Sequence, residues 1–223
     1  TKLIEYKNQL GELAERKPVI ELPPVAREIN ERNVAVKSFL CPNLEMKIWV
    51  GGHRYRLHGS LYYEKPQNFR VNIHSFFGKE VDIGSNNKLF WYWSRRDRNP
   101  GVHYARHEDL HKTGLKNPFN PIFVRATLGL DDLPAKDCKL VEKGDDIMLV
   151  YPRQNASGQP LLFSVLVNKK RKQIDGYVLT DHKGETIAAC EIQEYNGNVP
   201  TKILYNWYEE NHVMLMVFIR PQL

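Results

Sequence analysis

Residues 61–93 read LYYEKPQNFRVNIHSFFGKEVDIGSNNKLFWYW, and this stretch decides the fold that the sequence predicts. Short runs rich in aromatic and β-branched residues alternate in it with polar turns at 66–68, 77–79 and 85–87. Runs of this kind between turn residues are typical of antiparallel strands joined by hairpins. The last run, Leu89 to Trp93, is the most aromatic of them. We therefore interpret the stretch as part of a sheet that holds an apolar ligand.

The same alternation of short runs and turns extends in both directions along the chain. We expect strands at 44–50, 55–63, 69–76, 80–83, 89–94, 102–106, 146–151, 161–167, 174–180, 186–195, 202–209 and 213–219. We expect these twelve runs to form a sheet of about ten or eleven strands. With only one helical interruption, such a chain cannot be a doubly wound α/β fold, which needs a helix between parallel strands. The sequence predicts a mainly β (α+β) protein built as an antiparallel meander.

Helical patterns precede the sheet and interrupt it once. Residues 3–16 predict a short amphipathic helix that stops near Pro18, and Pro24 marks the start of a second helix. The strand pattern breaks at 111–135, where Pro121 begins a possible short helix that we interpret as a lid or crossover. We expect a single domain over 1–223, with 1–23 as an N-terminal extension.

Composition and charge limit the classes of function. A hydrophobic fraction of 42% allows a globular core, and the net charge of +6 permits anionic partners without selecting one. No apolar run approaches the ~20 residues of a bilayer-spanning helix. The chain begins at Thr1, so a signal peptide or a lipidated cysteine could precede it.

The three cysteines, Cys41, Cys138 and Cys190, lie far apart and form no C-x-x-C pair, which argues against a zinc site. At most one disulfide fits, and the odd count slightly favours a reducing compartment.

A run of histidines is the strongest sign of enzyme chemistry. His103, His107 and His111 lie four residues apart, so on a helix they could ligate one metal ion. On a strand, His103 and His107 would be ~13 Å apart and could not share it. Strand rhythm favours the second case, and the chain has no nucleophile elbow, phosphate loop or dinucleotide fingerprint. We expect no enzyme activity, no metal and no cofactor.

Two basic clusters, 95–98 and 169–172, would serve a nucleic-acid site beside the aromatic strand. Both lie at predicted strand ends, where solvated turns are the ordinary explanation. We expect no nucleic-acid partner.

Several segments together suggest a family. They are the helix before the sheet, the strand and turn at 61–70, the polar turn and aromatic strand at 82–93, the lid at 117–129 and the late hairpin at 180–186. In order and spacing this set resembles the Lol-type bacterial lipoprotein carriers (LolA-like) and their outer-membrane receptor relatives (LolB-like). The resemblance covers most of the chain from about Val25 onward and implies a curved antiparallel half-barrel, a helical lid and an apolar cavity for acyl chains.

The resemblance also implies roles for individual residues. Lys65 stands where the carriers have an arginine that holds the lid closed by hydrogen bonds to its backbone, and Arg70 is an alternative donor. A lysine lacks the planar fork of arginine. Phe76 and Phe77 stand where the receptors have a loop that touches the outer membrane, although packing under a neighbouring loop is an alternative.

Strand alternation extends the list of ligand-site candidates. Leu89, Trp91 and Trp93 share one face of their strand, and Phe90 and Tyr92 share the other, so a helix could cover one face and a lipid the other. Core packing is the alternative explanation for each residue. The residues expected to line the lipid site are Trp49, Phe69, Val71, Ile73, Leu89, Trp91, Trp93, Phe123 and Phe163.

The function expected from these observations is non-enzymatic binding and transfer of lipid or lipoprotein acyl chains. The expected location is the periplasm or the inner leaflet of the outer membrane, as a peripheral or lipid-anchored protein. An envelope scaffold or sensor that binds a protein partner is an alternative, and a metal-dependent enzyme using the His run is a further one.

Overall fold

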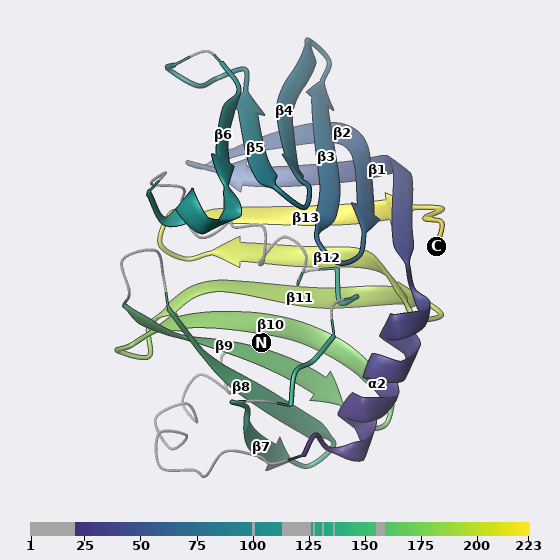
Figure 1. Ribbon diagram of the computed structural model, residues 1–223. Helices are drawn as coiled ribbons and strands as arrows, with labels where there is room; N and C mark the ends of the chain where they lie inside the picture. Colours follow the sequence, from purple (N-terminus) through teal and green to yellow (C-terminus); the bar gives the residue numbers. More distant parts are fainter. Residues whose placement is uncertain are drawn as a thin grey trace.

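The fold is one open antiparallel sheet. The structure, a computed structural model, describes residues 21–99, 101–112, 126, 128–130, 132–135, 137–154 and 159–223. Thirteen strands form the sheet in this part of the chain (Figure 1). They are β1 (Ser38–Val50), β2 (His53–Glu64), β3 (Asn68–Ser75), β4 (Gly78–Ser85), β5 (Leu89–Ser94), β6 (His103–Arg106), β7 (Lys139–Lys143), β8 (Asp146–Gln154), β9 (Pro160–Asn168), β10 (Gln173–Asp181), β11 (Thr186–Asn196), β12 (Val199–Trp207) and β13 (His212–Ile219).

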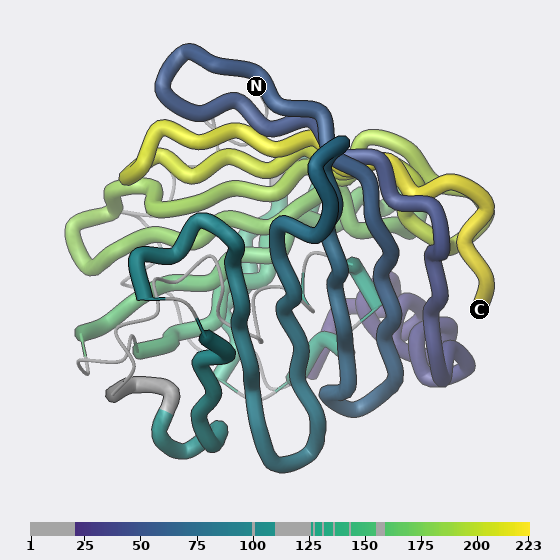
Figure 2. The backbone as a smooth tube through the Cα atoms, turned by 90° about the horizontal axis from the view of Figure 1, so that it is seen from above, coloured from purple at the N-terminus to yellow at the C-terminus, as the bar shows by residue number. Residues whose placement is uncertain are grey.

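The strand order joins two meanders. It runs β6-β5-β4-β3-β2-β1-β13-β12-β11-β10-β9-β8-β7, so β1 pairs with β13 where the meanders meet and β6 and β7 are the edges. Figure 2 shows the sheet bent into an open arch. The predicted mainly β half-barrel is confirmed, although β7 was not anticipated and the strands are more numerous than expected.

One α-helix of the described part of the chain lies beside the sheet. α2 (Pro24–Ala35) begins with Pro24 at its first position, as predicted, because a proline there loses no helical hydrogen bond. Its buried residues, Ala26, Ile29 and Asn33, recur at helical spacing and contact the sheet side. The helix predicted at 3–16 lies outside the described residues.

The helix marks one end of the strands. Arg32 of α2 donates to Asn198 in the β11–β12 turn at 2.9 Å, and Lys172 in the β9–β10 turn pairs with Glu28 at 3.0 Å. Lys65, in the β2–β3 turn, also reaches α2. We call this the helix end. The β1–β2, β3–β4 and β5–β6 turns lie at the opposite end, which we call the hairpin end.

The main core fills the concave face of the arch. Strand alternation directs Phe39, Phe69, Phe90, Tyr177 and Tyr205 to this side. A smaller apolar cluster, Val141, Met148, Val150 and Leu166, lies on the other face of β7–β9. None of the helices in the described part of the chain has the length and apolarity that a bilayer crossing requires.

β1 shows how the sequence adjusts the sheet. Its register with β2 shifts between Cys41 and Leu44, on either side of Pro42. Proline has no N–H to give to a strand ladder, so it is tolerated at such a bulge. The bulge keeps both Phe39 and Met46 on the concave face.

Candidate functional site

A row of partly exposed apolar side chains lines the concave face. Pairing places Ile48 opposite Met214 and Tyr92 opposite Ile83, which itself lies opposite Val71. Ile83 is buried in the core, whereas the other four side chains pack against the core and are only partly buried. We call the following set the concave row. Its members are Ile48, Leu57, Val71, Val81, Tyr92 and Met214.

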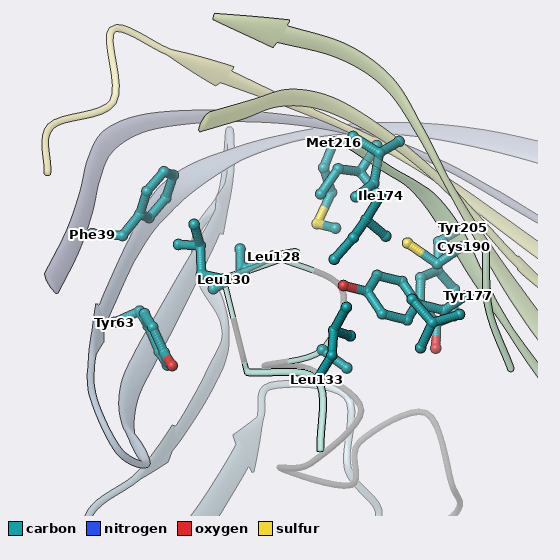
Figure 3. Packing of buried hydrophobic residues seen from close by; sticks show 14 of the residues in the cluster. Phe39, Tyr63, Leu128, Leu130, Leu133, Ile174, Tyr177, Cys190, Tyr205 and Met216 are labelled. Atoms are coloured by element: carbon teal, nitrogen blue, oxygen red, sulfur yellow. The ribbon is translucent and has the colours of Figure 1, made fainter. Parts of the chain in front are cut away.

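A segment of the chain enters the same concave side. Residues 126, 128–130 and 132–135, which we call the inner segment, belong to the region expected to form a lid. Leu128, Leu130 and Leu133 are buried in the core cluster. Figure 3 shows these leucines between Phe39 and Tyr63 from one half of the sheet and Tyr177 and Tyr205 from the other. The arch is therefore filled in part by its own chain.

The inner segment turns at Gly129. Its backbone N–H donates to the Ala126 carbonyl at 2.9 Å, and its φ of +66° lies in the left-handed region that favours glycine. A Cβ at this position would lie 3.2 Å from Ile192 Cδ1, so a side chain would press on the core. Glycine suits this position on both grounds.

Two asparagines of α2 hold the inner segment by its backbone. Asn30 Nδ2 donates to the Leu133 carbonyl at 2.8 Å, and the Leu133 N–H donates to Asn30 Oδ1 at 2.7 Å. Asn33 Nδ2 donates to the Gly129 carbonyl at 3.2 Å. Sequence analysis did not single out Asn30 or Asn33. Their position on the helix face toward the sheet is the signal that could have found them, because buried polar groups there need partners.

Lys65 connects the β2–β3 turn to both elements. Its Nζ donates to the Asn33 carbonyl at 2.7 Å and pairs with Asp132 Oδ1 at 3.0 Å. The contact with the lid region is thus to a side chain, whereas the resemblance implied its backbone. A single ammonium suits these two separate acceptors, because it needs no planar fork. Whether the contact acts as a latch remains a prediction.

Arg70 does not lie in that contact. Its Nη2 pairs with Asp82 Oδ2 at 2.8 Å and its Nε donates to Oδ1 at 3.2 Å, on the convex face of β3 and β4. The expectation that Arg70 could replace Lys65 as a donor to the lid is therefore wrong, because alternation directs residue 70 away from the face that Phe69 and Val71 share.

The residues predicted to line one lipid site divide between two faces. Phe69, Val71, Ile73 and Phe163 are on the concave side, where Phe163 stacks on Tyr177 with ring centroids 5.5 Å apart. The pairing of β4 with β5 puts Ile83 opposite Tyr92, so Phe90 and Tyr92 share the concave side. The convex residues are Trp49, Leu89, Trp91 and Trp93. Phe123 lies outside the described residues.

This division corrects the predicted grouping of the tryptophans with the Phe69 row. The aromatic strand is apolar on both faces, so alternation alone could not tell which face was concave. On the convex side, Trp49 lies under the Arg54 guanidinium, and Lys79 Nζ lies 5.7 Å from the Trp93 ring centroid. Both rings pack against cations at the surface.

Trp91 belongs to a polar cluster around Asp82. Its Nε1 donates to Asp82 Oδ1 at 3.3 Å, and any side chain on Gly84 would overlap its ring. Burial alone would raise the pKa of Asp82, but hydrogen bonds from Arg70, Lys79 and Trp91 outweigh it and lower the pKa to about 2. The carboxylate is charged at neutral pH and holds three strands together on the convex face.

Phe76 and Phe77 form the tip of the β3–β4 hairpin. The two residues are 96% and 77% exposed, and their ring centroids lie 5.6 Å apart in an edge-to-face contact. Because both residues are largely exposed, they are not packed under a neighbouring loop, which was the alternative explanation. Contact with a membrane remains a prediction.

The histidine run does not share one helix. His103 lies on β6 with Nε2 3.2 Å from Asp97, whereas His107 begins the 3-10 helix η2 (His107–Lys112) and its Nε2 lies 2.7 Å from the Asn86 carbonyl. The alignment that a shared ion would need is therefore lost between these two residues. The described residues contain no group of three or more His, Cys, Asp or Glu placed to hold a metal ion.

The three cysteines are free and buried. Burial raises the pKa of the Cys190 thiol well above its ordinary value. A neutral, buried thiol is unreactive, so these residues act as core side chains.

Comparisons by sequence found no relatives. No model of a protein family matches the chain, and no curated protein matches its sequence.

Comparison of structures finds proteins with a similar fold. A LolA superfamily protein from Nitrosomonas europaea matches with a TM-score of 0.55 and 13% identity, over 89% of this chain and 93% of that one. The chain has the LolA-type fold. A protein domain from Vibrio parahaemolyticus that is described as outer-membrane lipoprotein-sorting matches with a TM-score of 0.60 and 9% identity, over 89% and 90% of the two chains.

A third similar structure has a description that names a family and no function. A DUF1329 family protein from Desulfovibrio piger matches the LolA-type fold of this chain with a TM-score of 0.57 and 11% identity, over 89% and 90% of the two chains. At these identities the likeness concerns the fold and does not extend to the residues that would bind a ligand.

Proposed function

We propose that this protein binds acyl chains of a lipid or lipoprotein on the concave face of its sheet and transfers them without chemistry. The observation that carries the proposal is the concave row, an apolar surface on β1–β5 and β13 that is only partly buried. An acyl chain laid along it would gain about 0.8 kcal/mol per buried CH2. Ten such groups would contribute about 8 kcal/mol before the cost of ordering the chain.

The inner segment gives the proposal a means of control. Leu128, Leu130 and Leu133 fill the concave side with branched apolar side chains, which an acyl chain could replace at little cost in apolar contact. Polar contacts from Asn30, Asn33 and Lys65 hold this segment at one end. Release of these contacts would open the concave face for loading.

The proposed location is the bacterial cell envelope. The solved domain from Vibrio parahaemolyticus with the same fold is described as lipoprotein-sorting, and the exposed Phe76 and Phe77 would serve contact with a membrane where cargo is taken up or delivered. Both a soluble carrier and a membrane-anchored receptor would use acyl binding on the concave face and contact with a membrane.

Two adjacent residues of β5 provide a matched test. Tyr92 belongs to the concave row and Trp93 lies on the convex face of the same strand. A Tyr92→Lys variant should lose most binding of a fluorescent fatty acid and most co-purified lipid in native mass spectrometry, because the charge would be desolvated by the bound chain. A Trp93→Lys variant should bind as the parent does.

The opposite ranking, with loss in Trp93→Lys alone, would move the acyl site to the convex face. A parent protein that carries no lipid and takes up none would contradict acyl binding and would favour the alternative of an envelope scaffold that binds a protein. Melting curves of both variants serve as the control for folding.

A further inference from the structure

The positive charge of the chain is concentrated in one part of the sheet. Residues 53–106, which form β2 to β6, contain ten Lys and Arg against four Asp and Glu. The difference of +6 equals the net charge of the whole chain, because the remaining residues hold 22 cationic and 22 acidic side chains. One half of the arch therefore carries all of the excess charge.

Within that half, much of the excess gathers at the hairpin end. Arg54 and Arg56 follow the β1–β2 turn, Lys79 follows the β3–β4 turn, and Arg95, Arg96 and Arg98 lie at the start of the β5–β6 turn. The turns contact one another: Arg95 Nη1 donates to the Phe77 carbonyl at 2.6 Å, and the Arg96 guanidinium lies 5.4 Å from the Tyr55 ring centroid. These two contacts link the β5–β6 turn to the β3–β4 turn and to β2, so the basic residues of the three hairpins lie at the same end of the sheet as Phe76 and Phe77.

A second basic cluster shows the contrast. Lys169, Lys170, Arg171 and Lys172, at the helix end, pair with Glu142, Asp145, Asp175 and Glu28 respectively. These pairs neutralise the cluster. At the hairpin end, Lys79 pairs with Asp82, and Arg95 and Arg96 share the single carboxylate of Glu80. Arg54, Arg56 and Arg98 are exposed and form no ion pair with any residue that the structure describes.

We propose that the hairpin end docks on an anionic phospholipid bilayer, with Phe76 and Phe77 entering the interface and the arginines of the three hairpins contacting lipid phosphates. The two phenylalanines project from the tip of a hairpin, which suits a deformable surface better than a folded protein partner with fixed pockets. Each cation near an anionic leaflet adds about a fivefold gain in partition. This inference rests on the membrane contact proposed above and adds its lipid class.

The test is flotation of the full chain with vesicles of phosphatidylcholine alone and of phosphatidylcholine with about one third phosphatidylglycerol. The parent should bind the anionic vesicles, bind the neutral ones weakly, and dissociate when salt is raised from about 0.1 M to about 0.5 M, since exposed charges are then screened. An Arg56→Gln and Arg98→Gln double variant should bind the anionic vesicles roughly 30-fold more weakly.

A matched control removes two charges elsewhere. Lys37 and Lys88 are exposed and lie at the helix end, so a Lys37→Gln and Lys88→Gln double variant has the same net charge and should bind as the parent does. A Phe76→Ser and Phe77→Ser double variant should keep salt-sensitive attraction but bind both kinds of vesicle more weakly.

Each of the other outcomes would contradict a specific part of the docking proposal. Equal binding to neutral and anionic vesicles, insensitive to salt, would overturn the anionic docking and leave the proposed phenylalanine contact. Equal loss in the two charge variants would overturn the hairpin end as the docking surface. Binding to neither vesicle would overturn this inference and the proposed membrane contact together, without bearing on acyl binding at the concave face, and would favour an acidic protein as the partner.

Discussion

At the scale of single residues, Asp82 is the polar centre of the convex face. Because its pKa is lowered to about 2 from an ordinary 3.8, the folded state gains stability from its charge above pH 4 and loses it as the pH falls toward 2. We predict that Asp82→Asn lowers the free energy of unfolding by about 2 kcal/mol at pH 7, as measured by urea denaturation.

The pH dependence distinguishes this charge effect from loss of packing. The difference in stability between parent and Asp82→Asn should shrink as the pH is lowered from 4 toward 2, because the parent carboxylate is then neutralised. Glu45→Gln, an exposed residue on the same face, is the control and should change stability little. A constant difference across this pH range would mean that packing, and not charge, explains the effect.

The sequence alone did not show which face of each strand is concave, and this limited the prediction of residue roles. Lys65 contacts the side chain of Asp132, whereas the resemblance implied a bond to the lid backbone, and its role as a latch stays a prediction. The sequence could not decide between Lys65 and Arg70 as the donor to the lid region, because the direction of the Arg70 side chain depends on which face of β3 is concave. The same ambiguity misplaced Trp91 and Trp93, and the pairing of Ile83 with Tyr92 resolves it.

At the scale of elements, the contact between α2 and the inner segment is the one that lid movement must break. Asn30 makes two hydrogen bonds to Leu133, each worth about 1 kcal/mol. We predict that Asn30→Ala raises hydrogen exchange at the Leu133 amide by roughly tenfold or more, because the segment opens more often.

Glu31→Ala changes the neighbouring exposed residue of the same helix and provides the control. It should leave exchange at Leu133 as in the parent. Unchanged exchange in Asn30→Ala would mean that the buried leucines alone hold the segment, and that the polar contacts do not control its release.

Elements were predictable where local signals were strong. Pro24 gave the start of α2, and the aromatic run gave β5 as Leu89–Ser94 with both bounds correct. β7 was missed because Lys139–Lys143 is short, carries three charged residues and pairs with a single neighbour, so its sequence resembles a loop. Pairing with β8, which no local pattern reveals, makes it a strand.

At the scale of the whole molecule, three regions of the arch differ in their surface properties. The concave face offers apolar surface, the helix end holds the inner segment, and the hairpin end carries exposed phenylalanines among excess cations. Composition and turn spacing were enough to predict the mainly β class. The curvature of the sheet, and hence the face that a ligand meets, depends on the pairing of β1 with β13, which joins residues far apart in the sequence.

The central claim is that acyl chains lie on the concave row. The most direct measurement is photolabelling with a fatty acid that carries a diazirine near its chain end, followed by mass spectrometry that locates the label at single residues. We predict label on members of the concave row such as Val71, Tyr92 and Met214. Label confined to Trp91 and Trp93, or none above that of the unfolded chain, would contradict the claim.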